Sequence, residues 1–111
     1  TLDKTQYSFK SRFEEGVGTN PEELLGAAHA GCFTMKLSFV LGEAGFTPES
    51  IETVATVALE DGAITSSVLA VKAKVPGISD EAFQKAATDA KENCPISKAI
   101  SASISMTAEL V

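Results

Sequence analysis

The pattern of apolar positions predicts one long helix over residues 20–41. Its beginning carries strong helix signals, because Asn20 can cap, Pro21 suits the first helical position and Glu23 is placed to close a capping box. Beyond this start, apolar and small side chains fall on nearly every face of the helix. A helix that is apolar all round is typical of a buried element, so we predict a central buried helix.

Two glycines and a cysteine lie inside this helix. Gly26 and Gly31 each lower helix stability by about 1 kcal/mol relative to alanine, so we expect both to permit close packing against another backbone. Cys32 follows directly and would sit in the wall of the buried helix. A thiol in that position is either an inert core residue or a site of chemistry.

Four further segments alternate between apolar and polar residues, a pattern that predicts half-buried strands. They are residues 6–14, 51–60, 63–75 and 103–110. Glu60-Asp61-Gly62 has the turn chemistry of a hairpin between the second and third of these strands. A second helix is expected from its cap at Ser79 to its end at Asn93. Cys94 then precedes Pro95, which suits the start of a short additional helix.

The resulting order, β-α-β-β-α-β, indicates an α+β fold in a single domain over residues 1–111. It permits a ferredoxin-like sandwich, and it also permits a long buried helix packed on a mostly antiparallel sheet. Length favours the second layout, because a helix over residues 20–41 spans roughly 33 Å and outruns a small sheet. A helix that long and apolar would expose surface in a lone domain, so we expect a homodimer.

Charge and composition limit which kinds of binding partner are expected. A net charge of −6 and a pI near 4.7 argue against nucleic acid and anionic membrane. Lys36 and several Ser and Thr positions interrupt the apolar segment, so no membrane span is expected. The chain begins at Thr1 without the basic and apolar segments of a signal peptide, so we expect a cytoplasmic protein and, in the absence of an initiator Met, further residues upstream.

The two cysteines are too few for a disulfide framework in a chain of this size. Three interpretations stay open: two buried thiols, one structural disulfide, or a redox pair. Cys94 favours the redox pair, because the amides at a helix start stabilise a thiolate and lower its pKa. Cys32 lies far from Cys94 along the chain, so only the tertiary fold can bring the two sulfurs together.

Three charged or titratable positions accompany the thiols. Arg12 is the nearest candidate cation to activate one of them, although it is equally placed to be a simple exposed charge on a strand. Glu22 suits the positive end of the helix dipole and needs no other role. His29 shares a helix face with Cys32. A metal site built from this histidine and both cysteines matches no known zinc spacing, and a hydrogen-bonded packing residue is the simpler interpretation.

Three segments resemble the OsmC/Ohr family of thiol peroxidases, and the resemblance covers essentially the whole chain. They are YSFKSRFEEG at 7–16, TNPEELLGAAHAGCF at 19–33 and ENCPISKAI at 92–100. Because it contains a histidine, the segment AAHAGCF resembles the osmotically inducible protein C (OsmC) branch of the family rather than the organic hydroperoxide resistance branch. The resemblance implies an OsmC-like intertwined homodimer with long central helices and active sites at the subunit interface. It also implies further N-terminal strands upstream of Thr1.

The resemblance implies a role for each candidate residue. Cys32 matches the peroxidatic cysteine and Cys94 the resolving cysteine, which forms a disulfide with the Cys32 sulfenic acid. Arg12 matches the arginine that holds the thiolate, and Glu22 matches the glutamate that positions that arginine. The implied activity is reduction of organic hydroperoxides, with hydrogen peroxide as a further candidate, in oxidative or osmotic stress defence. No metal or haem is implied, and the electrons would come from an external dithiol, notably a lipoyl group or lipoylated protein.

Elementary chemistry agrees with these roles. Burial raises the pKa of a cysteine, so Cys32 would need a fixed cation beside it to react as a thiolate. An apolar lining from Phe33, Met35 and Phe39 would favour alkyl peroxides.

Two other functions stay open. One is a catalytically silent dimeric domain of the same fold that binds a hydrophobic ligand or a lipoylated partner. The other is a structural protein with two buried thiols.

One geometric difficulty concerns Glu22. It precedes Cys32 by ten residues, so on one straight helix about 15 Å of rise separates the two. A single arginine does not easily touch both. We therefore expect Glu22 to reach the Cys32 site from the partner subunit, or the helix to bend near Gly26.

Overall fold

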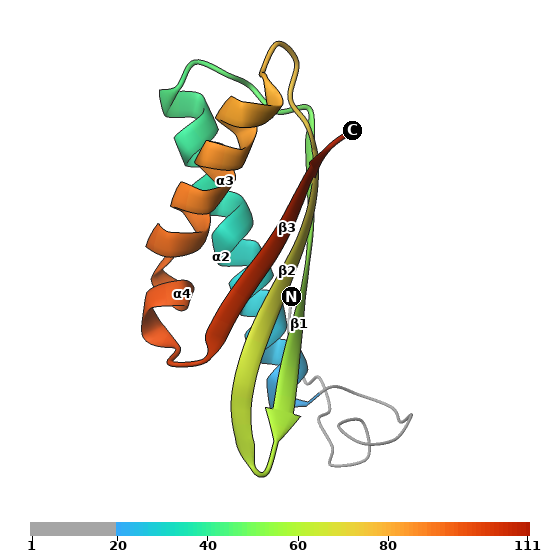
Figure 1. The fold of residues 1–111 in the computed structure, drawn as a ribbon, viewed down its shortest axis with the longest axis vertical. Helices are drawn as coiled ribbons and strands as arrows, with labels where there is room; N and C mark the ends of the chain where they lie inside the picture. Colours follow the sequence, from blue (N-terminus) through green and yellow to red (C-terminus); the bar gives the residue numbers. More distant parts are fainter. Residues whose placement is uncertain (1–19) are drawn as a thin grey trace, which may run out of the picture.

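The computed structural model describes residues 20–111, so the predicted strand over residues 6–14 and the candidate Arg12 lie outside the described residues. The elements run in the order α2 (Pro21–Glu43), β1 (Ser50–Glu60), β2 (Ala63–Lys74), α3 (Asp80–Asn93), α4 (Pro95–Ala99) and β3 (Ser103–Leu110). Within this range the helices and strands follow the order expected from the sequence. They form two layers, with the three helices against one face of the sheet (Figure 1).

Local chemistry accounts for most of the boundaries. Asn20 caps α2 by accepting a 2.9 Å hydrogen bond from the backbone N–H of Glu23. Ser79 caps α3 in the same way, through the N–H of Ala82. At the β1–β2 turn, Asp61 and Gly62 both have positive φ, as a type I′ hairpin requires. These expectations from the sequence are confirmed.

The sheet has the strand order β1-β2-β3. Strand β2 pairs antiparallel with β1, whereas it pairs parallel with β3, from Ser66 opposite Ser103 to Ala73 opposite Leu110. The described sheet is therefore mixed, with a longer antiparallel pairing between β1 and β2 and a shorter parallel pairing between β2 and β3. The parallel pairing follows from the connection, because α3 and α4 carry the chain back along the sheet before β3 begins (Figure 1).

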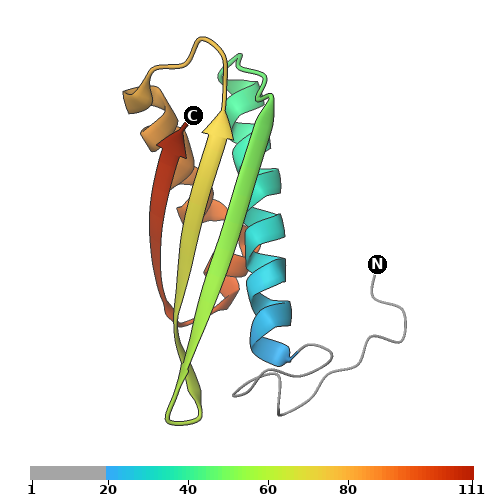
Figure 2. The ribbon, with the colours of Figure 1, turned by 90° about the vertical axis from the view of Figure 1, so that its right-hand side faces the viewer.

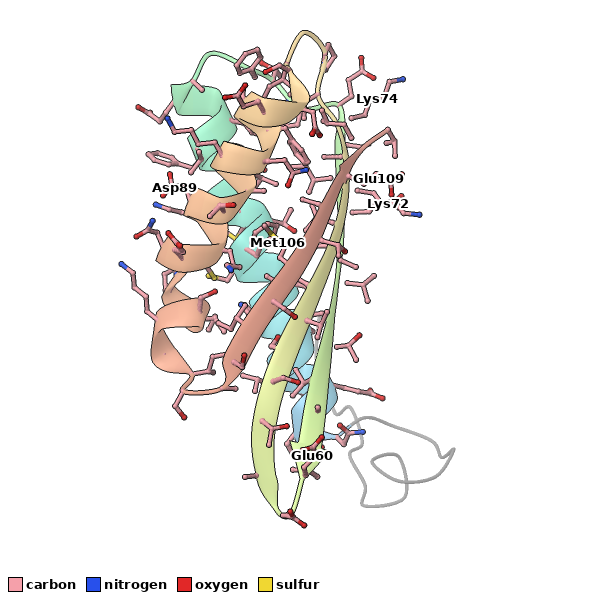
Figure 3. The ribbon with its side chains drawn as sticks, in the orientation of Figure 1. Glu60, Lys72, Lys74, Asp89, Met106 and Glu109 are labelled. Atoms are coloured by element: carbon pink, nitrogen blue, oxygen red, sulfur yellow. The ribbon has the colours of Figure 1, made fainter. Side chains whose placement is uncertain are left out.

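The core lies between the sheet and the helices. Leu37 and Leu41 of α2, Leu69 of β2 and Phe83 of α3 are all fully buried. Figure 3 shows Met106 on the helix side of the sheet. The opposite side of the sheet has no helix over it within residues 20–111 (Figure 2).

Helix α2 is buried on one face only, which corrects the expectation of a helix buried all round. Its buried stripe packs on the sheet and α3, while Met35 and Phe39 on another face are 76% and 60% exposed. By length and hydropathy α2 also passes the criterion for a membrane span, contrary to the expectation from Lys36. The core helix of a globular protein passes the same criterion, and one face of α2 belongs to the hydrophobic core.

The two helix glycines differ in their surroundings. A Cβ on Gly26 would meet the backbone oxygen of Ala55 in β1 at 3.1 Å, so this glycine does permit close helix–strand packing. A Cβ on Gly31 would meet nothing within 4 Å in the described chain. The close-packing explanation is confirmed for Gly26 and has no support at Gly31.

Candidate active site

The two cysteines meet at the junction of three helices. Cys32 projects from the middle of α2, and Cys94 is the residue between α3 and α4. Their sulfur atoms lie 2.9 Å apart, with both residues present as free thiols. The fold therefore joins two sulfurs that are far apart in the sequence, within reach of a disulfide after a small adjustment.

The two thiols differ in accessibility. Cys94 is fully buried by this chain alone, whereas Cys32 is half-buried. Cys32 opens into an apolar hollow of about 580 Å³, whose other lining residues include Met35, Phe39, Pro95 and Ile96. Phe33 is fully buried in the core instead, so its predicted place in the lining is wrong. A small molecule in the hollow would reach Cys32 and not Cys94.

The pKa values of Cys32 and Cys94 are shifted in opposite directions by their surroundings. Burial raises the pKa of Cys32, and its hydrogen bond with Cys94 raises that pKa further. For Cys94, burial also acts to raise the pKa, but hydrogen bonds involving Cys32, Ser97 and the N–H of Ile96 outweigh it, and its pKa is lowered. The Cys94 side chain makes no capping hydrogen bond to α4, so its lowered pKa comes from several neighbouring groups rather than from one capping contact.

His29 lies on the buried face of α2, one turn before Cys32. Its Nδ1 is 2.7 Å from Oγ of Ser67 in β2, and its Nε2 is 2.8 Å from Oγ of Ser97 in α4. Burial lowers the pKa of His29 and keeps the imidazole neutral. The prediction of a hydrogen-bonded packing residue is confirmed. Both ring nitrogens are engaged by serine hydroxyls.

The sequence interpretation gave no role to these two serines. Ser97 stands in the segment ENCPISKAI that carried the resemblance, but nothing in its spacing indicated a contact with His29. Ser67 gave a clearer signal, because it occupies an inward position of β2 in line with Leu69 and Val71, where an apolar residue is typical. An inward serine on a buried strand face requires a hydrogen-bond partner.

The structure does not bring Glu22 to the thiols of its own chain. Glu22 lies in the first turn of α2 and lines a different hollow, of about 840 Å³, together with the β1–β2 turn and residues 99–102. Helix α2 continues without a break past Gly26. Glu22 and Cys32 therefore stand on one continuous helix, and the route by which Glu22 would act at the Cys32 site stays a prediction.

These features define a class of protein: an α+β domain in which a core helix holds one thiol against a second, buried thiol. Residues 14–109 match the family model described as OsmC-like protein. The chain therefore belongs to the OsmC-like family, which confirms the resemblance found in the sequence.

Two similar proteins agree with this assignment. The chain is 48% identical to Peroxiredoxin OsmC of Escherichia coli (strain K12) over 113 residues, which cover 98% of this chain and 79% of that protein. It is 37% identical to Organic hydroperoxide resistance protein-like 1 of Staphylococcus saprophyticus over 86 residues, 74% of this chain and 61% of that protein.

Solved structures support the fold. The organic hydroperoxide resistance protein OhrB of Bacillus subtilis superposes with a TM-score of 0.65 at 29% identity, covering 86% of this chain and 73% of that one. An OsmC-like protein from Mycoplasma pneumoniae gives a TM-score of 0.78 at 14% identity, over 86% of this chain and 74% of that one. At that identity the second likeness shows the fold alone.

Proposed function

We propose that this chain is a cysteine-based peroxidase that reduces organic hydroperoxides in stress defence. The observation that carries the proposal is the 2.9 Å separation of the Cys32 and Cys94 sulfurs, one facing an apolar hollow and the other fully buried. The names of the relatives support it, since one is called a peroxiredoxin and others are called organic hydroperoxide resistance proteins.

In the proposed cycle, the Cys32 thiolate attacks the terminal oxygen of the hydroperoxide. The O–O bond breaks, the alcohol leaves, and Cys32 becomes a sulfenic acid. The Cys94 thiolate then attacks the Cys32 sulfur, releasing water and forming the disulfide. An external dithiol of the lipoyl type, free or on a lipoylated protein, reduces that disulfide and supplies both electrons. The cycle is complete without a metal or an organic cofactor.

The difference in accessibility supports the proposed roles of the two cysteines. Cys94 has the lowered pKa, but a hydroperoxide has no path to a fully buried sulfur. Cys32 meets the hollow, whose apolar lining suits an alkyl peroxide. The raised pKa of Cys32 means that a cation must be brought to it before it reacts as a thiolate. We assign that task to Arg12, whose charge is permanent and whose planar fork can contact sulfur and carboxylate together.

We further propose that the active protein is a homodimer, with the exposed apolar face of α2 as part of its interface. Met35 and Phe39 are strongly exposed in the single chain, and both border the hollow at Cys32. A second copy packed on this face would cover the open side of the hollow. It would also allow Glu22 to act on the Arg12 guanidinium beside the other subunit's Cys32.

The alternative function is a catalytically silent domain that binds a hydrophobic ligand or a lipoylated partner in the same hollow. The apolar lining favours binding of this kind as much as it favours a peroxide. The paired sulfurs distinguish the two functions, because binding alone does not require a second thiol behind the first.

Intact-mass measurement tests the proposal. The reduced protein, treated with one equivalent of an alkyl hydroperoxide, should lose two hydrogen atoms in mass. Cys32→Ser should show no oxidation, and Cys94→Ser should instead gain one oxygen atom as the sulfenic acid. An unchanged mass of the parent protein would favour the binding domain.

Arginine substitution tests the activation step. Arg12→Ala should slow oxidation of Cys32 by about tenfold or more, because the thiolate loses its cation. Lys36→Ala is the matched control. Lys36 borders the same hollow, but its Nζ lies over the Phe39 ring, 5.3 Å from the centroid, so its loss should leave the rate nearly unchanged. Equal rates in the parent and Arg12→Ala would remove the arginine from the mechanism.

Analytical ultracentrifugation tests the dimer. Phe39→Glu should shift the protein from dimer to monomer, since it places a charge in the proposed interface. Thr88→Glu, on the exposed side of α3, should leave the dimer intact. A monomeric parent protein would contradict the proposal.

A further inference from the structure

His29 is a fully buried titratable residue that the proposed cycle does not use. It is one helical turn from Cys32, and it bridges β2 and α4 through two serine hydroxyls at 2.7 and 2.8 Å. Every buried side-chain nitrogen or oxygen in the described chain has a hydrogen-bond partner. Burying three polar side chains together is costly unless their hydrogen bonds are all made, so the order of donors and acceptors in this cluster is constrained.

Ser67 fixes that order. Within residues 20–111, its hydroxyl has His29 as its hydrogen-bond partner, and Ser67 is fully buried. If Ser67 accepted a proton from Nδ1, its own hydroxyl proton would be buried without an acceptor. The satisfied arrangement has Ser67 donating to Nδ1. A neutral imidazole with an acceptor at Nδ1 carries its proton at Nε2, so His29 donates to the oxygen of Ser97.

Ser97 connects this order of donors and acceptors to the active-site cysteine Cys94. Ser97 lies in α4, three residues after Cys94, and its side chain acts to lower the Cys94 pKa. With its oxygen accepting from His29, its single hydroxyl proton is free to point at the Cys94 sulfur. The opposite tautomer of His29 would draw the Ser97 proton back to Nε2 and remove this donor from sulfur. The cluster therefore runs in one direction, from Ser67 through His29 and Ser97 to Cys94.

We propose that His29 is a positioning residue that acts through Ser97 to make Cys94 the leaving thiolate when the Cys32–Cys94 disulfide is reduced. The inference rests on the proposed function, because it concerns the reductive half of that cycle. It assigns to one buried histidine the control of which sulfur departs.

Burial decides where the reductant attacks. Cys94 is fully covered by its own chain, and an added subunit cannot uncover it, whereas Cys32 meets the hollow. The thiolate of an external dithiol attacks the Cys32 sulfur and forms a mixed disulfide. The Cys32–Cys94 bond breaks, and its electron pair leaves on Cys94, where the Ser97 hydroxyl stabilises it. The second thiolate of the reductant then displaces Cys32, giving a cyclic disulfide and two reduced cysteines. The two thiol protons of the reductant pass to solvent or to the cysteines.

A leaving thiol departs faster when its pKa is low, so the serine–histidine cluster should accelerate this step. The first test measures the Cys94 pKa directly, in a Cys32→Ser background, from the pH dependence of thiolate ultraviolet absorbance. Ser97→Ala should raise that pKa by about one unit, and His29→Leu should raise it by roughly half a unit. His29→Gln should restore the parent value, because its amide can accept from Ser67 and donate to Ser97.

Circular dichroism and the thermal midpoint show whether each variant is folded. If His29→Leu fails to fold, Ser67→Ala serves in its place. This substitution removes the hydroxyl that donates to Nδ1, so the imidazole is still present but its proton is no longer held on Nε2. The proposal would be overturned if the Cys94 pKa were unchanged in folded Ser97→Ala. It would also be overturned if that pKa were unchanged in both His29→Leu and Ser67→Ala, with both variants folded. Failure of His29→Gln to restore the pKa in a folded protein would overturn it as well.

The second test follows reduction of the disulfide, with both cysteines present and the disulfide formed by diamide. Ser97→Ala should slow reduction by dithiothreitol roughly threefold. Trapping with a monothiol, 2-mercaptoethanol, should place the thiol adduct on Cys32 and a subsequent alkyl label on Cys94. The reverse distribution would overturn the proposal. Neither measurement on the disulfide uses peroxide, so a parent protein inert to hydroperoxide would refute the proposed function alone.

Discussion

The two faces of α2 are similar in sequence and opposite in surroundings. On one face, His29, Phe33 and Leu37 are fully buried against the sheet and the other helices. On the other face, Met35 and Phe39 are largely exposed in the single chain. The hydrophobic content of the helix indicates that both faces will be covered, but it does not distinguish an intramolecular core from a surface for another chain.

Cys32 lies where the two faces meet. It contacts Cys94 on the buried side and borders the hollow on the exposed side. A thiol at this boundary can react with a molecule from outside and then be resolved from inside the protein. In the proposed cycle, the two steps depend on this difference between the faces of the helix.

The largest expected effect is a loss of folding stability when a side chain on the buried face of α2 is truncated. Leu37→Ala should lower the free energy of unfolding by about 2–5 kcal/mol, because Leu37 is fully buried and its truncation leaves a cavity. Met35→Ala should cost less than about 1 kcal/mol at protein concentrations that favour the monomer. Urea unfolding at several concentrations measures both. Equal losses in dilute solution would show that the two faces are not distinct.

A smaller effect distinguishes the two glycines of the helix. Gly26→Ala should destabilise the fold, because overpacking against the Ala55 carbonyl costs about 1–3 kcal/mol and exceeds the gain in helix propensity. Gly31→Ala should stabilise the monomer by up to about 1 kcal/mol, since its Cβ meets no atom of the chain. Thermal midpoints in the monomeric Phe39→Glu background measure the difference. A gain in both variants would contradict tight packing at Gly26.

The smallest effect is a pH dependence from the buried face. Burial lowers the pKa of His29 below its ordinary value of 6.5, so the unfolded chain binds more protons than the folded chain between those two pKa values. The histidine therefore costs no stability above pH 6.5, and stability is lost progressively as the pH falls from 6.5 toward the folded-state pKa.

His29→Gln should remove this part of the pH dependence, because glutamine does not titrate. The free energy of unfolding, measured by urea titration on both sides of pH 6.5, provides the comparison. Thr88→Gln on the exposed side of α3 is the control and should retain the parent slope. An unchanged slope in His29→Gln would show that the histidine is not held neutral by burial.

Much of the local structure could be predicted because it depends on neighbouring residues. Asn20 and Ser79 cap their helices through the backbone three residues ahead, and Asp61-Gly62 forms the turn through its own backbone freedom. Cys32 and Cys94 could be singled out, and the family could be assigned, from short segments. The catalytic roles of Cys32, Cys94, Arg12 and Glu22 stay predictions.

Helix starts and the hairpin turn could be predicted from the chain alone, since caps and turn residues act on backbone only a few positions away. Three features required the folded chain to be known: β3 runs parallel to β2, one face of α2 is exposed in the single chain, and Ser67, His29, Ser97 and Cys94 lie in one cluster. Those features join residues that are distant along the chain. They depend on how packed layers align in space, which no local pattern of side chains specifies.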